Sequence, residues 1–150
     1  MEESALSEQQ LIAWALKDDK SAIECLNLLS SASQTLDDLY DQDKKLARIA
    51  PINMVMNLTV LLHRNEFFRR HSSEVINLLE RAIRRWLEAS DLEEKKQLLC
   101  VSYVIRSAMT DLTIDMAYLV GGPDWGRSAA VEIRKFVYTE PFEDYLQEHS

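Results

Sequence analysis

The sequence predicts an all-α fold, a single-domain bundle of five to seven helices packed around one long central helix. Apolar residues recur three and four positions apart along most of the chain, which is the spacing of one helical face. All three glycines fall within residues 121–126, whereas strand-rich folds need many tight turns, which commonly use glycine. Residues 98–120 carry only three charges, so we expect a helix buried on most sides. A length of 150 residues suits one domain, residues 1–150.

Capping residues and apolar spacing place the earlier elements. Four helices are expected before the central one, over about residues 8–17, 21–44, 51–64 and 72–89. Ser7 with Gln10 is a capping box for the first. Pro51 fits the first turn of the third. Residues 65–71 are expected to form a kinked or loop-like joint before the fourth.

The long central helix is expected over about residues 91–121. Asp91 with Glu94 is a second capping-box pattern and would begin it. Gly121-Gly122-Pro123 would end it, because glycine accepts the left-handed conformation and proline blocks continuation of a helix. Two more helices are expected after it, over about residues 124–138 and 141–147.

The chain is acidic, with a formal net charge of -8 at pH 7. This charge disfavours a nucleic-acid binder, because neutralising phosphates needs an excess of lysine and arginine. It suits a soluble protein, a basic partner, or a surface that mimics nucleic acid. The charges within residues 98–120 argue against a membrane span, and the acidic start lacks the regions of a signal peptide. We therefore expect a cytoplasmic protein.

An acidic run lies near the end of the second expected helix. Asp37, Asp38 and Asp41 project on one side of it, where like charges repel and the helix dipole disfavours anions. A divalent cation, neighbouring lysine and arginine side chains, or solvent alone could offset this repulsion. The string Asp37-Asp38-Leu39-Tyr40-Asp41 also matches the DDxxD pattern with which isoprenoid synthases hold magnesium diphosphate. The second acidic motif of those enzymes is missing here.

Asp111 and Asp115 form a second acidic pair, on one face of the expected central helix. Buried carboxylates without partners are costly, so this face must reach solvent, meet basic side chains of another helix, or hold a cation. One hypothesis places the pair opposite Asp37, Asp38 and Asp41, so that five aspartates hold magnesium or manganese between helices. The alternative is a structural network of ion pairs.

Two groups of residues are candidates for contact with a partner. Arg81, Arg84 and Arg85 belong to a locally basic stretch, which could hold phosphate or an acidic partner, or be neutralised by glutamates one turn away. Trp125 and Arg127 follow the central helix, in either a plain helix-to-helix turn with Trp125 in the core or a contact loop. No arrangement of a nucleophile with a base indicates catalysis.

Several segments together resemble small all-helical proteins of tailed bacteriophages, which are usually without an assigned function. These segments are DDLYDQD (37–43), NEFF (65–68), Trp86, LVGGPDW (119–125) and EIR (132–134). The resemblance covers most of the chain and implies a helical accessory or virion-associated protein made in the host cytoplasm. We therefore expect a non-enzymatic interaction protein that acts through an acidic surface or by self-association. The alternative is a divalent-metal-dependent phosphate or diphosphate enzyme that uses the five aspartates.

Overall fold

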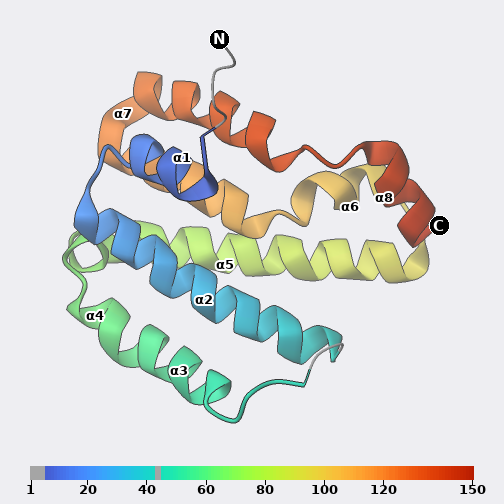
Figure 1. The fold of residues 1–150 in the computed structure, drawn as a ribbon, viewed down its shortest axis with the longest axis horizontal. Helices are drawn as coiled ribbons and strands as arrows, with labels where there is room; N and C mark the ends of the chain where they lie inside the picture. Colours follow the sequence, from blue (N-terminus) through green and yellow to red (C-terminus); the bar gives the residue numbers. More distant parts are fainter. Residues whose placement is uncertain (1–5, 43–44) are drawn as a thin grey trace. The chain divides into compact units, whose positions relative to one another are not determined.

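The computed structural model describes residues 6–42 and 45–150, and these residues form helices and no strand (Figure 1). The predicted all-α fold class is confirmed. The elements are α1 (Glu8–Ala15), α2 (Lys20–Asp41), α3 (Ala50–Met56), η1 (Asn57–Leu61), α4 (Leu62–Arg64), α5 (Glu66–Lys95), α6 (Leu99–Ile105), α7 (Ala108–Val137) and α8 (Phe142–His149). The π-helical stretch η1 joins α3 and α4 into one continuous rod. With that rod counted once, the described residues form seven helices, within the predicted range.

Residue contacts divide the chain into two compact units. Unit 1 holds the described residues up to Lys17 together with Ile76–Ser150, and unit 2 holds Asp18–Val75. Helix α5 contributes to both units, because it crosses the division between residues 75 and 76. The single domain over residues 1–150 stays a prediction.

In unit 1, α1 packs against α7. The predicted capping box is confirmed at the start of α1. The Ser7 N–H donates to Gln10 Oε1 at 2.9 Å, and the Gln10 N–H donates to Ser7 Oγ at 3.2 Å. Ala15 is the last residue of α1 and Leu16 follows it, and both side chains are fully buried. The Ala15 carbonyl accepts a hydrogen bond from Trp125 Nε1 at 2.8 Å, which fixes α1 on α7.

The predicted continuous central helix over about residues 91–121 is wrong. Helix α5 continues through Asp91 to Lys95, so Asp91 lies inside a helix and caps none. The chain then turns at Lys96 and Leu98, which both have positive φ angles. A second break at Ser107 separates α6 from α7. An apolar composition favours burial, but it does not determine where the backbone leaves the helical conformation.

Tertiary contacts account for the direction that α6 takes in unit 1. Tyr103 Oη donates to the Glu140 carbonyl at 2.6 Å, and Arg106 pairs with the Glu140 carboxylate at 2.8 Å, which holds α6 beside α8. Residues 98–120 were expected to be buried, but their first residue, Leu98, is 64% exposed to solvent. The predicted burial is found in α7, where Met116 is fully buried. No helix in the described part of the chain combines the length and apolarity that a membrane crossing requires.

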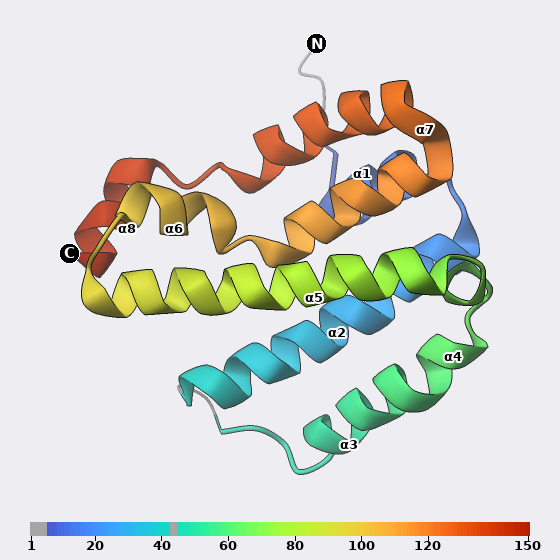
Figure 2. The same cartoon turned by 180° about the vertical axis from the view of Figure 1, so that it is seen from behind.

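Helix α7 turns back on itself at Gly122, which has φ 84° and ψ -178° (Figure 2). The helix end predicted at Gly121-Gly122-Pro123, and the helix predicted after it, are confirmed. The two parts of α7 approach closely near this turn, since a Cβ atom at Gly126 would lie 2.3 Å from the Tyr118 ring. The turn brings residues that precede and follow it onto one side of unit 1.

In unit 2, α2 packs against the rod formed by α3, η1 and α4. The Asp19 side chain caps α2 by accepting a hydrogen bond from the Ala22 N–H at 3.0 Å. Helix α2 ends at Asp41. It was expected to reach residue 44, but Asp43 and Lys44 lie outside the described residues.

The joint predicted at residues 65–71 is mostly helical. Helix α5 begins at residue 66, and the kink is confined to His71, with φ -119° and ψ 26°. The buried Asn65 precedes this helix, and its Oδ1 accepts from the Phe68 N–H at 2.8 Å. Its Nδ2 donates to the Ser21 carbonyl at 2.9 Å, which connects the start of α5 to α2 within unit 2.

Candidate functional site

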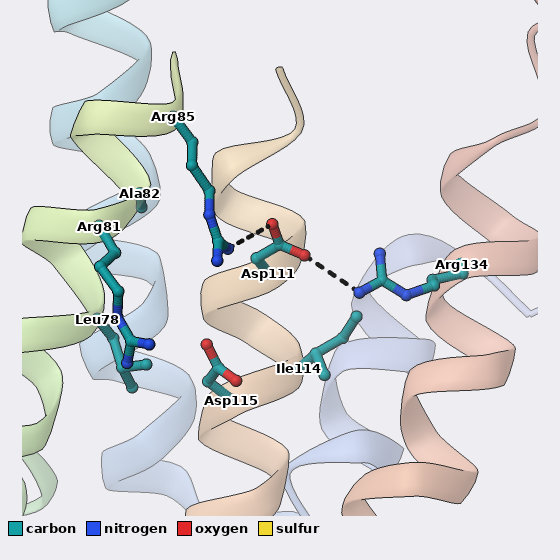
Figure 3. Close-up of a pocket in the computed structure, with 8 residues that line it drawn as sticks. All are labelled: Leu78, Arg81, Ala82, Arg85, Asp111, Ile114, Asp115 and Arg134. Carbon is teal, nitrogen blue, oxygen red and sulfur yellow. Dashed lines mark hydrogen bonds and ion pairs between the residues drawn. The ribbon is translucent and has the colours of Figure 1, made fainter. Parts of the chain in front are cut away.

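A pocket of about 180 Å³ lies in unit 1, between α5 and the two parts of α7 (Figure 3). Three arginines, two aspartates and three apolar residues line it. They are Leu78, Arg81, Ala82, Arg85, Asp111, Ile114, Asp115 and Arg134. Charged side chains from three helical segments therefore line one pocket.

Helical periodicity explains how these residues come together. The four from α5 are spaced by three, one and three positions, which places them on one face. Asp111, Ile114 and Asp115 have the corresponding spacing on the first part of α7. Arg134 comes from the second part of α7, and the turn at Gly122 brings it opposite Asp111.

Asp111 is paired on both sides. Its Oδ2 accepts from Arg85 Nη1 at 3.2 Å, and its Oδ1 accepts from Arg134 Nη2 at 3.2 Å (Figure 3). The Asp111 side chain is 21% exposed and the two arginines are about twice as exposed. Ion pairs this accessible to solvent stabilise a protein by up to about 1 kcal/mol each. The expectation that basic partners would come from another helix holds for Arg85 of α5.

Asp115 and Arg81 point into the same pocket but form no direct bond. Figure 3 shows the two charged groups facing each other across an open space. Neither makes a hydrogen bond or ion pair within the described residues, whereas Asp111 uses both of its oxygens. Burial raises the pKa of the Asp115 carboxyl and the neighbouring Asp111 raises it further, against the smaller effects of Arg81, Arg85 and Arg134. The ionised Asp115 is therefore a hydrogen-bond acceptor that receives no hydrogen bond from residues 6–42 or 45–150.

The three other predicted metal ligands lie on α2 in unit 2. Asp41 is exposed, and Asp38 Oδ1 accepts a hydrogen bond from Gln34 Nε2 at 3.1 Å. Within neither unit do the described residues include three or more His, Cys, Asp or Glu side chains grouped closely enough to bind a metal ion. The meeting of Asp37, Asp38 and Asp41 with the aspartates of α7 stays a prediction.

The predicted partner-contact residues have different surroundings. Arg84 is exposed and pairs with Glu80 one helical turn away, as its spacing suggested. Arg127 is exposed on α7. Trp125 is half-buried, and its ring lies 4.9 Å from that of Trp14 between centroids, so it packs inside unit 1. Partner contact by these residues stays a prediction.

Sequence reasoning missed Arg134 as a member of this site. A signal for it was present in the sequence. Asp111 precedes Gly122 by nearly as many residues as Arg134 follows it, so a helical hairpin that turns at Gly122 brings the two together.

The chain matches no protein-family model, no curated protein and no solved structure. The resemblance to tailed-bacteriophage proteins therefore stays a prediction.

Proposed function

We propose that this chain is a non-enzymatic interaction protein that holds an anionic group of a protein partner in the pocket of unit 1. Arg81 carries the proposal, because its guanidinium faces the pocket and makes no hydrogen bond or ion pair there within the described residues. Three guanidinium groups face two carboxylates in this pocket, so it is locally basic in a chain of net charge -8. A guanidinium binds a carboxylate or phosphate through two parallel N–H donors.

Self-association is one form of this proposal. A second copy of so acidic a chain carries many carboxylates that could enter the pocket. From the sequence we expected the protein to act through an acidic surface, whereas the pocket favours a basic site that binds acidic groups. The two are compatible where the acidic surface of one copy meets the pocket of another.

Titration with a hexaglutamate peptide, followed by NMR of the arginine side-chain Nε–Hε groups, tests the proposal. We expect the Arg81 signal to move on binding, and Arg81→Ala to weaken the affinity about tenfold through loss of a charge-assisted hydrogen bond. Arg70→Ala is the matched control, since Arg70 lies on the same helix and pairs with Glu66. An affinity that Arg81→Ala leaves unchanged would contradict the proposal.

A further inference from the structure

We infer that this pocket is a binding site for a phosphate group, in which Arg81 binds the anionic oxygens and Asp115 accepts a hydrogen bond from a P–OH. The inference rests on the proposed function, since it names the chemical class of the anionic group. It assigns a role to each of the two charged side chains that face each other without a direct bond.

The size of the pocket suits a single small anion. Its volume is about 180 Å³. Sites that enclose drug-sized ligands are usually larger, from about 300 Å³ upward. A phosphate group fits, whereas a complete nucleotide would extend beyond the pocket.

The arginines provide more donors than Asp111 uses. Each guanidinium has five N–H donors, and Asp111 takes one hydrogen bond from Arg85 and one from Arg134. These bonds also fix the position of the two guanidinium groups before any ligand arrives. Together with Arg81, they offer a preorganised set of donors to a tetrahedral oxyanion.

Asp115 makes the site selective for an oxyanion that carries a proton. An ionised carboxylate can only accept hydrogen bonds, so a fully deprotonated ligand oxygen beside it would be repelled. Phosphate carries at least one P–OH at pH 6, and a phosphate monoester carries one in about half of its molecules, because its second pKa is about 6. Sulfate carries none.

Calorimetric titration of the whole chain at pH 6 with sodium phosphate and sodium sulfate tests the inference. We expect wild-type protein to bind phosphate at least about tenfold more tightly, because sulfate leaves the Asp115 acceptor unpaired. Asp115→Asn supplies an amide donor of nearly the same shape, so sulfate should then bind about as tightly as phosphate. Arg70→Ala, outside the pocket, should keep the wild-type preference, and thermal melts confirm that each variant is folded.

Each result bears on the inference. Equal binding of both anions by wild-type protein would overturn the selectivity and leave the proposed function standing, since an anion would still occupy the pocket. Binding of neither anion would overturn the inference, and only failure of the glutamate peptide as well would remove the proposed function. A phosphate preference that persists in Asp115→Asn would exclude Asp115 as the selecting group.

A phosphoserine hexapeptide serves as a third ligand, since the phosphate could be free or carried by a partner. Tighter binding of the peptide than of inorganic phosphate would assign the group to a partner protein. Equal or weaker binding of the peptide would assign the site to the free ion. Either result is consistent with the same chemistry at Arg81 and Asp115.

Discussion

Asp111 and Asp115 lie one helical turn apart on α7, yet their surroundings give them different properties. Both oxygens of Asp111 accept hydrogen bonds from arginines, so its charge is balanced. Asp115 has arginines nearby without a direct bond, and burial raises its pKa. At the residue scale, the chemistry of this pocket depends on which donors reach which carboxylate.

Asp115→Asn is expected to stabilise the protein at pH 7 by roughly 0.5 kcal/mol, the scale of changes at partly exposed positions. The pKa of Asp115 is higher in the folded protein than the ordinary 3.8, so its ionised form opposes folding. This cost is absent below pH 3.8 and complete above the folded-state pKa. The advantage of the variant should therefore shrink as the pH falls. Urea denaturation of the variant and the wild-type protein, from pH 7 down to below pH 3.8, measures the difference in their free energies of unfolding. A difference that stays constant with pH would contradict the prediction.

Asn65→Ala is expected to destabilise the protein by about 2 kcal/mol. The substitution removes the N-cap of α5, worth about 1 kcal/mol, and a buried hydrogen bond to the Ser21 carbonyl of similar value. Asn65→Ser keeps a capping oxygen and loses the amide donor to the Ser21 carbonyl, so its effect should be smaller. Asn53→Ala, at an exposed position on α3, is the control and should be nearly neutral in the same urea denaturation.

At the element scale, the sequence predicted that most segments are helical, but it did not predict where the chain breaks and changes direction. Periodicity and caps located α1, the α3–η1–α4 rod and α8 to within a few residues, and the glycines located the turn in α7. The breaks beside α6 depend on contacts to Glu140, far away in the sequence. The pocket was half predictable for the same reason. Helical spacing places Asp111 beside Asp115 and Arg81 near Arg85, each pair on one helix, but the meeting of these pairs with each other and with Arg134 depends on the fold.

Gly122→Ala is expected to destabilise the protein by about 1–3 kcal/mol, because φ 84° with ψ -178° is strained for any residue with a Cβ atom. A Cβ atom there would meet nothing within 4 Å, so the cost is conformational rather than steric. The exposed Ser128→Ala on the same helix is the control. A loss below about 0.5 kcal/mol in urea denaturation would show that α7 turns without this strained conformation.

Magnesium at 5 mM is expected to raise the melting temperature by less than about 1 °C. The carboxylates of Asp37, Asp38 and Asp41 near the end of α2 attract cations, but screened attraction at an exposed helix end is weak. A specific site would stabilise by mass action, with a saturable rise in melting temperature. A rise of several degrees that Asp38→Asn abolishes would support the metal-enzyme alternative.

At the scale of the whole molecule, the fold class followed from properties summed over many residues. The scarcity of glycine and the helical periodicity are averages that no single contact can reverse, so the all-α class was predictable. The division of the chain into two compact units depends on contacts between residues far apart in the sequence, so the composition does not predict it. The single domain predicted from the length concerns how these units unfold, which an experiment can decide.

Both units are expected to unfold in one transition, because α5 crosses the division between them and its interruption would leave backbone groups unpaired. The three tryptophans, Trp14, Trp86 and Trp125, all belong to unit 1, so their fluorescence reports on that unit alone. Circular dichroism reports on the helices of both. The two signals should give the same urea midpoint, within about 0.1 M.

Asn65→Ala distinguishes the alternatives most sharply, because its contacts all lie in unit 2. If the chain is one cooperative domain, the variant lowers the fluorescence midpoint and the dichroism midpoint equally, although no tryptophan is near the substitution in the sequence. If the units unfold separately, dichroism is lost at lower urea while the tryptophan signal stays at the wild-type midpoint. That second result would replace the single-domain prediction with two domains that share α5.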